Sequence, residues 1–382
     1  MIRTILFKAV LTITAVVSVA VNGYAQAAKA EAAIQGIMEQ MDVVGLGVAV
    51  VKKDAIVYTN SFGLKDIESN TPLTNNDIFR IASISKSFSA TSVMQLVEAG
   101  KLSLKDDISN LVGFEVRNPK YPEKVITLKM VLSHTSSIND SQGYFTLDAI
   151  NPAKNPDWKK CYNDYEPGNG YEYCNLNFNM VGTIIEKKSG ERFDQYVKNH
   201  ILSPLNLYGG YCVDSLDAEL FTTLYAYDAG SDSFSPSPSA YAPRREEIRN
   251  YVMGYSTPIF SPTGGMKISA QDLAKYMAMH MNNGKYKGTR ILSKKSAKKM
   301  QAKVAENGYG LALTTVDDLI PGKTLKGHTG TAYGLYSAMF FHPKEKFGIV
   351  VITNGCNAPE SDEINKVITA TVNSLYTNLI KE

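Results

Sequence analysis

Residues 79–88 have the sequence FRIASISKSF, in which we expect a strand to end and a helix to begin. Ser83 falls on the first helical turn and Lys86 follows three residues later. Residues three apart share one face of a helix, so the Lys86 ammonium can reach the Ser83 hydroxyl without long-range folding. A lysine whose charged form is disfavoured by burial can take the proton of a serine.

The position of Ser83 also favours nucleophilic attack. Free backbone N–H groups and the positive end of the helix dipole lie at a helix start, where they stabilise the negative charge that develops on an attacked carbonyl. The stretch therefore predicts a nucleophile, with an ordinary helix-capping serine as the alternative.

The same Ser-x-x-Lys spacing occurs a second time, at Ser296 and Lys299. Ser296 lies in the lysine-rich run 294–299, which is typical of a solvated helix face. Ser83 instead is bracketed by apolar residues, including Ile81 and Ile84. The surroundings therefore separate the two, and they favour Ser83 as the reactive serine.

The composition limits the class of protein. The chain has 382 residues, 44% of them hydrophobic and 20% charged, which is typical of a globular protein with a large core. Its 40 basic and 37 acidic residues give a formal net charge of +3. This small excess argues against nucleic acid as a partner, because phosphate binding requires clustered basic residues.

Residues 1–27 have the pattern of an export signal. Arg3 and Lys8 precede the apolar run 9–21, and small residues follow at cleavage spacing. We therefore expect a mature chain of residues 28–382 in the periplasm or outside the cell. No other uncharged run approaches the ~20 residues of a membrane-spanning helix, so we expect no transmembrane anchor after signal removal.

The chain contains an even number of cysteines, and an oxidising compartment would permit disulfides. Cys161, Cys174, Cys212 and Cys356 can pair in three ways, and the sequence does not choose among them; we favour a pairing that joins Cys161 to Cys174. No Cys-x-x-Cys occurs, and the five histidines show no metal-ligand spacing. We expect neither a metal nor another cofactor.

Strand patterns gather at the two ends of the chain and helical patterns in the middle. The predicted strands are 43–51, 55–62, 309–315, 324–329, 336–342 and 347–353. The predicted helices include 28–41, 83–100, 175–188 and 270–281. We expect an α+β fold, with an antiparallel sheet flanked by helices and an inserted, mainly helical lobe.

This interpretation divides the mature chain into two lobes. The α/β lobe comprises about 28–101 and 251–382, and the helical lobe about 102–250. Within the helical lobe, residues 140–170 are polar and aromatic, which suits either a loop lining a cleft or an ordinary surface loop. Residues 231–243 are rich in Ser and Pro and predict a flexible surface excursion.

Tyr173-Cys174-Asn175 follows a glycine-rich loop and opens a helix. A phenol near a lysine ammonium has its ionised form favoured, so Tyr173 could pass a proton between the serine and a leaving group. The alternative is an N-capping asparagine beside a packed tyrosine. The pattern Tyr-x-Asn alone is not specific, because it recurs at residues 58–60 and 376–378.

His328-Thr329-Gly330, followed by Thr331, lies on a strand predicted near the sheet edge. Such an edge offers backbone N–H groups to an extended substrate, and Gly330 has no side chain to obstruct it. His328 and Thr329 would face the carboxylate end of such a ligand, unless His328 is an ordinary strand histidine. His134 is expected to be structural.

Three motifs follow one another along the chain: Ser83-x-x-Lys86, Tyr173-x-Asn175 and His328-Thr329-Gly330. In this order they resemble the motifs of the penicillin-recognising serine hydrolases. The similar branch contains class C β-lactamases, D-alanyl-D-alanine carboxypeptidases, related esterases and D-aminopeptidases. The resemblance covers nearly the whole mature chain and implies a β-lactamase/transpeptidase-like fold.

The resemblance also implies roles for single residues. Ser83 would form an acyl-enzyme, Lys86 and Tyr173 would handle its proton, and Asn175 would hold the substrate amide. The backbone N–H groups of Ser83 and Thr331 would form the oxyanion hole.

One departure concerns the third motif, where true class C β-lactamases usually have lysine in place of His328. A histidine is only partly charged near neutral pH and would hold a carboxylate less firmly. We therefore expect an exported hydrolase of D-amino-acid peptides, amides or esters. The alternatives are a class C-type β-lactamase or esterase, and a penicillin-binding module without turnover. The substrate would be a small molecule or peptide, with peptidoglycan fragments and β-lactams as candidates.

Overall fold

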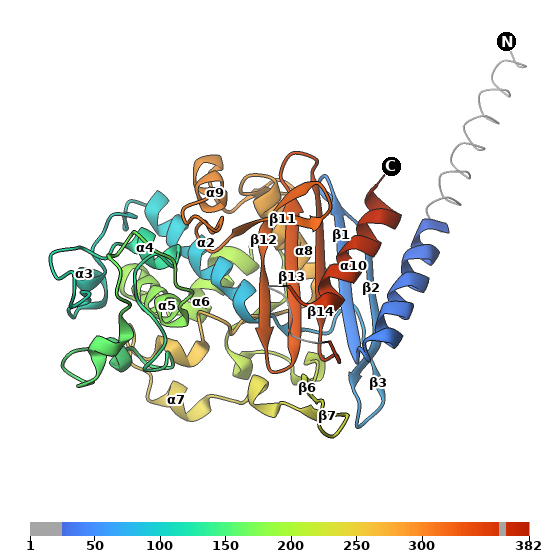
Figure 1. Ribbon diagram of the computed structural model, residues 1–382, viewed down its shortest axis with the longest axis horizontal. Coiled ribbons are helices and arrows are strands. Elements are labelled where there is room, and N and C mark those ends of the chain that lie inside the picture. Colours follow the sequence, from blue (N-terminus) through green and yellow to red (C-terminus); the bar gives the residue numbers. More distant parts are fainter. Residues whose placement is uncertain (1–24, 359–363, 382) are drawn as a thin grey trace, which may run out of the picture.

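Strands from both ends of the chain lie side by side in one antiparallel sheet (Figure 1). The structure is a computed structural model that describes residues 25–358 and 364–381. The order across the sheet is β11 (Thr314–Ile320), β12 (Lys323–Ala332), β13 (Leu335–His342), β14 (Phe347–Thr353), β1 (Gly45–Lys52), β2 (Ala55–Asp66) and β3 (Thr71–Pro72). The predicted α+β class with an antiparallel sheet is confirmed.

The sheet is apolar on both faces. Successive side chains of a strand point to opposite faces, and in β1 this places Val48 and Val50 in one hydrophobic cluster and Ala49 and Val51 in the other. Since β1 pairs with both β14 and β2, it lies inside the sheet, where both faces of the strand are buried.

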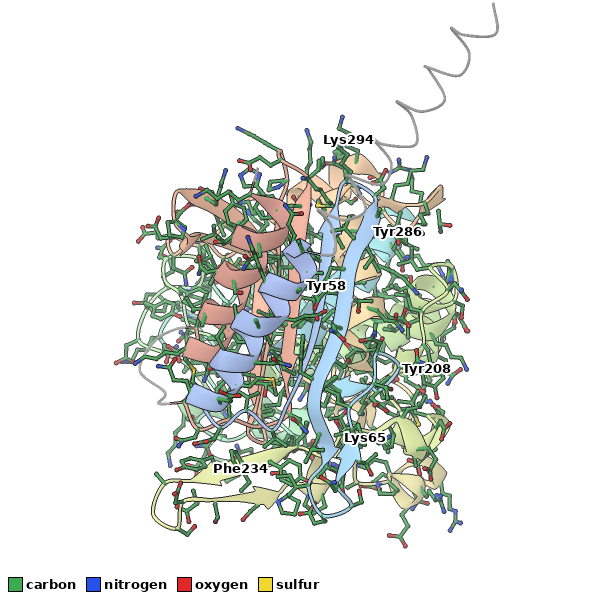
Figure 2. The ribbon with its side chains drawn as sticks, turned by 90° about the vertical axis from the view of Figure 1, so that its right-hand side faces the viewer. Tyr58, Lys65, Tyr208, Phe234, Tyr286 and Lys294 are labelled. Atoms are coloured by element: carbon green, nitrogen blue, oxygen red, sulfur yellow. The ribbon has the colours of Figure 1, made fainter. Side chains whose placement is uncertain are left out.

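Helices cover both faces of this sheet. The N-terminal helix, residues 25–40, and α10 (Lys366–Leu375) pack on one face, and Figure 2 shows them beside each other. On the other face, α8 (Ala270–Met281) contacts β1, β13 and β14. The bounds of α8 match those predicted from the sequence.

The middle of the chain is mostly helices and loops, on the left of Figure 1. Its helices are α3 (Ile108–Val112), α4 (Leu128–Leu132), α5 (Asn175–Ser189), α6 (Phe193–Val197) and α7 (Arg245–Arg249). Further short elements are β5 (Gly209–Gly210), β6 (Tyr225–Asp228), β7 (Ser233–Pro236), β8 (Lys267–Ile268), β9 (Lys285–Tyr286), β10 (Thr289–Arg290) and α9 (Lys294–Gln301). The division into two lobes at about 102 and 250 stays a prediction.

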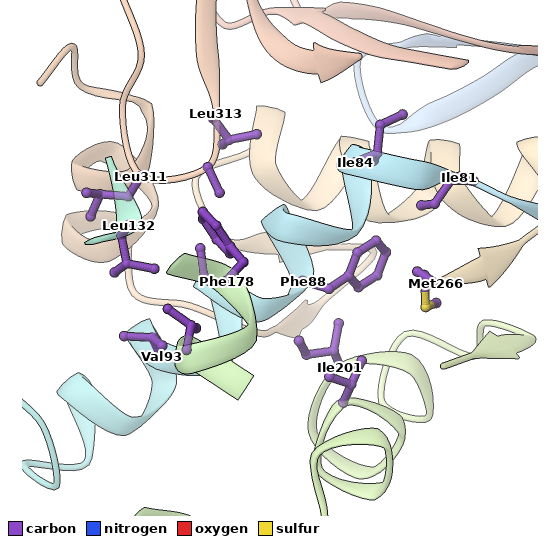
Figure 3. Packing of buried hydrophobic residues seen from close by; sticks show 14 of the residues in the cluster. Ile81, Ile84, Phe88, Val93, Leu132, Phe178, Ile201, Met266, Leu311 and Leu313 are labelled. Atoms are coloured by element: carbon purple, nitrogen blue, oxygen red, sulfur yellow. The ribbon is translucent and has the colours of Figure 1, made fainter. Parts of the chain in front are cut away.

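Helix α2 (Ser85–Glu98) lies between the sheet and α5, and it is buried on nearly all sides. Figure 3 shows its Phe88 and Val93 among side chains from other elements, including Phe178 of α5 and Met266. Polar side chains on a buried helix are tolerated only when they are hydrogen-bonded. In α2 they are: for example, the Ser89 hydroxyl donates to the carbonyl of Pro262, 2.8 Å away.

The strand predicted at residues 309–315 begins later than expected. Residues 309–313 do not belong to a strand, because Ala312 has a left-handed backbone with φ of 58° and the chain turns before β11 begins at Thr314. Residues 231–243 include β7, which pairs with β6 as an antiparallel hairpin. The segment is mostly exposed, in agreement with the predicted surface excursion, and its flexibility stays a prediction.

Most of the predicted signal segment, residues 1–27, lies outside the described residues, which begin at 25. Every helix within the described part of the chain is too short or too polar to cross a bilayer.

The expected disulfide between Cys161 and Cys174 is not formed. All four cysteines, Cys161, Cys174, Cys212 and Cys356, are buried free thiols. The Cys161 thiol donates to the carbonyl of Ala149 at 3.3 Å, and the Cys174 thiol donates to the carboxylate of Asp140 at 3.2 Å. Cys161 and Cys174 therefore each hydrogen-bond to a different residue. The spacing of cysteines in the sequence cannot reveal such partners.

Two glycine-to-alanine substitutions in helices should have opposite effects on stability. A Cβ on Gly182 of α5 would lie 2.3 Å from Cγ of Pro262, whereas a Cβ on Gly36 would meet nothing within 4 Å. Alanine gains roughly 0.5–1 kcal/mol over glycine in a helix, but overpacking costs roughly 1–3 kcal/mol. We therefore expect Gly36→Ala to raise the unfolding midpoint in urea and Gly182→Ala to lower it. Equal shifts of one sign would contradict the packing of α5 against Pro262.

Candidate active site

The three motifs meet in one cleft of about 600 Å³. Ser83, Tyr173, Asn175 and residues 328–331 all line it, although they come from widely separated parts of the sequence. The convergence that a hydrolase would require is therefore present, while the catalytic and binding roles of the residues stay predictions.

Ser83 lies in a single 3-10 turn, Ala82–Ile84, between β4 (Phe79–Arg80) and α2. The strand β4 pairs with β8 (Lys267–Ile268), which fixes the chain just before the turn. Ala82 has a positive φ of 45°, a sparsely populated conformation for a residue with a Cβ. Ser83 is partly exposed while the residues on either side of it are buried, so the turn presents this one side chain to the cleft.

Lys86 is completely buried and touches Ser83. Its Nζ lies 3.1 Å from Oγ of Ser83, 2.9 Å from Oδ1 of Asn175 and 3.0 Å from the carbonyl oxygen of Thr263. Burial lowers the pKa of Lys86 to about 7, although the charge of Asp140 opposes this shift. The local i, i+3 contact expected from the sequence is confirmed.

The partners of Lys86 determine where its lone pair can point. A neutral amine has two hydrogens and one lone pair, and both Asn175 Oδ1 and the Thr263 carbonyl can only accept hydrogen bonds. These two acceptors take the two hydrogens. The lone pair is left facing the Ser83 hydroxyl, which can donate. In its neutral form Lys86 is therefore oriented as a base toward Ser83.

Asp140 fixes the orientation of Asn175, and sequence reasoning missed it. Its carboxylate accepts from Nδ2 of Asn175 at 3.0 Å and from the backbone N–H groups of Asn175 and Leu176, at 2.7 and 2.9 Å. Because Nδ2 faces Asp140, Oδ1 must face Lys86. The second Nδ2 hydrogen remains for a substrate. Asp140 precedes Asn175 by 35 residues, so no local pattern joins them.

Tyr173 is a neutral phenol at the cleft, which corrects the expectation that its ionised form is favoured. Its ring lies 4.7 Å from Nζ of Lys86, but burial raises the pKa of Tyr173 well above its usual value. The nearby Ser83 hydroxyl only partly opposes this shift, and among the described residues no group meets hydrogen-bond geometry with the phenol. Tyr173 can thus donate a proton, whereas neutral Lys86 is placed to accept one.

His134 supports the segment that carries Tyr173. Its Nδ1 accepts from the backbone N–H of Cys174 at 3.1 Å, and its ring lies 4.3 Å from the ring of Tyr173. Burial holds the pKa of His134 well below its usual value, so the ring is neutral. These contacts agree with the structural role expected from the sequence.

His328 is neutral in this structure, so the expectation of a partly charged ligand for carboxylate is not met. The residue is only 4% exposed, and burial lowers its pKa to about 4. Nδ1 lies 2.5 Å from the carbonyl oxygen of Thr329 and carries the hydrogen, while Nε2 accepts from the Tyr309 hydroxyl at 2.9 Å. Both ring nitrogens therefore have partners within the protein.

The strand that carries His328 has a free edge at the cleft. β11 pairs with residues 323–327 of β12, and among the described residues no strand pairs with 328–332 on that side. The Ser83 turn packs here instead: a Cβ on Gly330 would lie 2.3 Å from the carbonyl oxygen of Ile81. The predicted strand edge is confirmed. Glycine is required at position 330 because the two backbones are in close contact.

The cleft is also lined by residues outside the three motifs. Tyr144 and Phe145 line the cleft, as one interpretation of the aromatic loop 140–170 predicted. Arg80 and Thr263 also line it, and no spacing relative to the motifs indicated either. Among the described residues, no three His, Cys, Asp or Glu side chains are placed to ligate a metal ion.

A serine at a helix start, a buried lysine one turn away, and a free strand edge are the features expected of a serine hydrolase site. The family model described as "Beta-lactamase" matches residues 30–373. The chain belongs to the β-lactamase family, whose members are serine hydrolases with the β-lactamase/transpeptidase-like fold.

Individual relatives are distant. "Protein flp" of Staphylococcus aureus (strain MRSA252) is 24% identical over 333 residues, which are 84% of this chain and 61% of that protein. The chain thus spans about three fifths of the length of such curated relatives.

Solved structures with the same fold include an octameric penicillin-binding protein homologue from Pyrococcus abyssi, with a TM-score of 0.73 and 26% identity over 92% of this chain and 77% of that one. A D-amino acid amidase from Ochrobactrum anthropi SV3 has a TM-score of 0.70 and 22% identity, with 91% of this chain and 98% of that chain covered.

The depressed pKa of Lys86 predicts the pH dependence of Ser83 acylation. Only the neutral amine could take the Ser83 proton, and its fraction increases as pH rises through the pKa of about 7. We expect the rate of labelling by a fluorophosphonate to rise with pH to a plateau, with a midpoint near that value. A flat profile between about pH 5 and 9 would contradict this role for Lys86.

The same profile tests Asp140. Its negative charge favours the ammonium form of Lys86, so Asp140→Asn should move the midpoint to lower pH. Asp148→Asn provides a control for the same change of charge, since Asp148 hydrogen-bonds to exposed Tyr255.

Proposed function

We propose that the protein is an exported serine hydrolase that acts through an acyl-enzyme on Ser83, on D-amino-acid peptides or on similar small amides or esters. The observation that carries this proposal is the 3.1 Å contact between Nζ of Lys86 and Oγ of Ser83, with Lys86 buried and its pKa near neutrality. An ordinary helix-capping serine needs no buried base.

In the proposed reaction, neutral Lys86 takes the hydroxyl proton as Oγ of Ser83 attacks the substrate carbonyl carbon. The backbone N–H groups of Ser83 and Thr331 stabilise the oxyanion. The carbonyl reforms as the bond to the leaving group breaks, and the leaving group takes a proton by way of Lys86 and Tyr173. Water then attacks the acyl-enzyme and releases the acid, which restores Ser83.

The substrate class rests on the cleft and on the third motif. His328 replaces the lysine usual in class C β-lactamases, and its neutral, fully hydrogen-bonded ring offers no cation for a carboxylate on that side. The fold is shared with a D-amino acid amidase, which makes D-amino-acid amides the first substrates to test. Export to the periplasm or medium is supported by the pattern of residues 1–27.

A panel of substrates tests the proposal against its rivals. It comprises a D-Ala-D-Ala peptide, a D-amino-acid anilide, a nitrophenyl ester and a chromogenic cephalosporin, each with intact-mass measurement of any adduct. We expect turnover of the D-amino-acid substrates. Turnover of the cephalosporin alone would assign a β-lactamase, and a stable adduct without turnover would assign a binding module.

Ser83→Ala should abolish labelling by a fluorophosphonate, because no other serine contacts a buried lysine in this cleft among the described residues. Ser296→Ala is the matched control, since Ser296 begins the second Ser-x-x-Lys of the chain. We expect it to label at the wild-type rate. Label retained in Ser83→Ala and mapped to another serine would overturn the assignment.

Lys86→Ala and Tyr173→Phe should each slow acylation or deacylation by about 100-fold, the usual contribution of a general acid or base. Stopped-flow measurement with the nitrophenyl ester separates the two steps. Tyr173→Phe keeps the ring against His134 and removes only the hydroxyl, so its thermal midpoint should stay close to that of wild type. Wild-type rates in Tyr173→Phe would remove the phenol from the mechanism.

A further inference from the structure

Arg80 is a positively charged residue in the active-site cleft. It lies three residues before Ser83, lines the same cleft, and also lines a smaller adjoining pocket. The pairing of β4 with β8 fixes its backbone opposite Lys267. The ring of Tyr333, at the end of β12, lies 5.0 Å from the guanidinium carbon of Arg80.

This guanidinium has no carboxylate partner among the described residues. Its hydrogen bonds go to neutral oxygens: Nε donates to the carbonyl of Gly264 at 2.9 Å, and Nη1 to the carbonyl of Ala240 at 3.1 Å. The basic groups that interact with it electrostatically are Arg244 and Lys267, neither of which supplies a counter-charge. A largely buried charge without a counter-charge is costly, so an anion supplied from the cleft would be stabilised here.

Arg80 also has the donors that such an anion requires. A guanidinium has five N–H groups, of which Nε–H and one on Nη1 are used, and a third on Nη2 makes a long contact of 3.5 Å to Oγ of Ser261. One N–H therefore remains on each terminal nitrogen. Charged N–H groups of this kind form strong hydrogen bonds with carboxylate oxygens.

The position of Arg80 relative to the proton donors indicates which part of a substrate it would meet. The leaving group must take a proton and therefore lies toward Tyr173 and Lys86, at the end of the free strand edge that carries His328. Arg80 and Tyr333 lie at the other end of that edge. The acyl part of the substrate points in this direction.

We propose that Arg80 binds a carboxylate on the acyl part of the substrate, so that the enzyme prefers anionic acyl donors. The proposal rests on the hydrolase function proposed above and adds the charge of the preferred substrate. The ring of Tyr333, which is 36% exposed, packs against the guanidinium. This arrangement would strengthen the contact by reducing the access of water.

The test compares two esters that differ by one carboxylate, N-succinyl- and N-acetyl-D-alanine p-nitrophenyl ester. For the wild-type protein, kcat/KM should be at least about tenfold higher for the succinyl ester, equivalent to about 1.4 kcal/mol. In Arg80→Gln this ratio should fall toward one, and in Arg80→Lys it should take an intermediate value. Arg249→Gln removes a positive charge from the exposed surface and should keep the wild-type ratio.

The ratio is taken within each variant, so a general loss of activity divides out. If Arg80→Gln does not fold, the ratios of kcat/KM measured for the wild type and for Arg80→Lys still test the proposal. Equal kcat/KM for the two esters in the wild type would overturn this proposal alone. A preference that Arg80→Lys and Arg80→Gln leave intact would overturn it as well. Failure to turn over either ester, together with absence of Ser83 labelling, would remove the proposed function and this proposal with it.

Discussion

The burial of the Lys86 amine beside Ser83 is the constraint on which the rest of the site depends. An amine keeps its usual pKa in water, and only removal from solvent lowers it to about 7. This requires α2 to be enclosed on nearly all sides, and it requires acceptors for the amine hydrogens. Asn175 and Thr263 supply these acceptors. Residues far apart in the sequence therefore hydrogen-bond to the same nitrogen atom.

The site contains few permanent charges. Burial keeps Tyr173, His134 and His328 neutral. Asp140 retains a contact with the N-terminus of α5, where backbone N–H groups hold its charge. Arg80, which is positively charged, also lines the cleft. The site thus has an anion hydrogen-bonded to Asn175 and a cation, Arg80, in the lining of the cleft.

Local features of the site were predictable from the sequence, and features that depend on packing were not. The contact between Ser83 and Lys86 follows from helix geometry alone, and the strand edge at Gly330 follows from strand pattern. The predicted charge states of Tyr173 and His328 were wrong because the desolvation of a side chain depends on the residues that pack over it. Asp140 was not predicted because its partner Asn175 is 35 residues away in the sequence. Arg80 was not predicted because its partners are backbone carbonyls of distant residues, which no sequence motif indicates.

The contact of Gly330 with the turn before Ser83 has a consequence for how such a scaffold diversifies. With no Cβ between them, the strand at Gly330 and the turn that carries Ser83 are packed backbone against backbone. Selectivity cannot then be tuned by shifting one against the other. It must be tuned at the rim, where Phe145 and Tyr333 are exposed on loops, so libraries aimed at new specificities should randomise these loops and leave the glycine untouched.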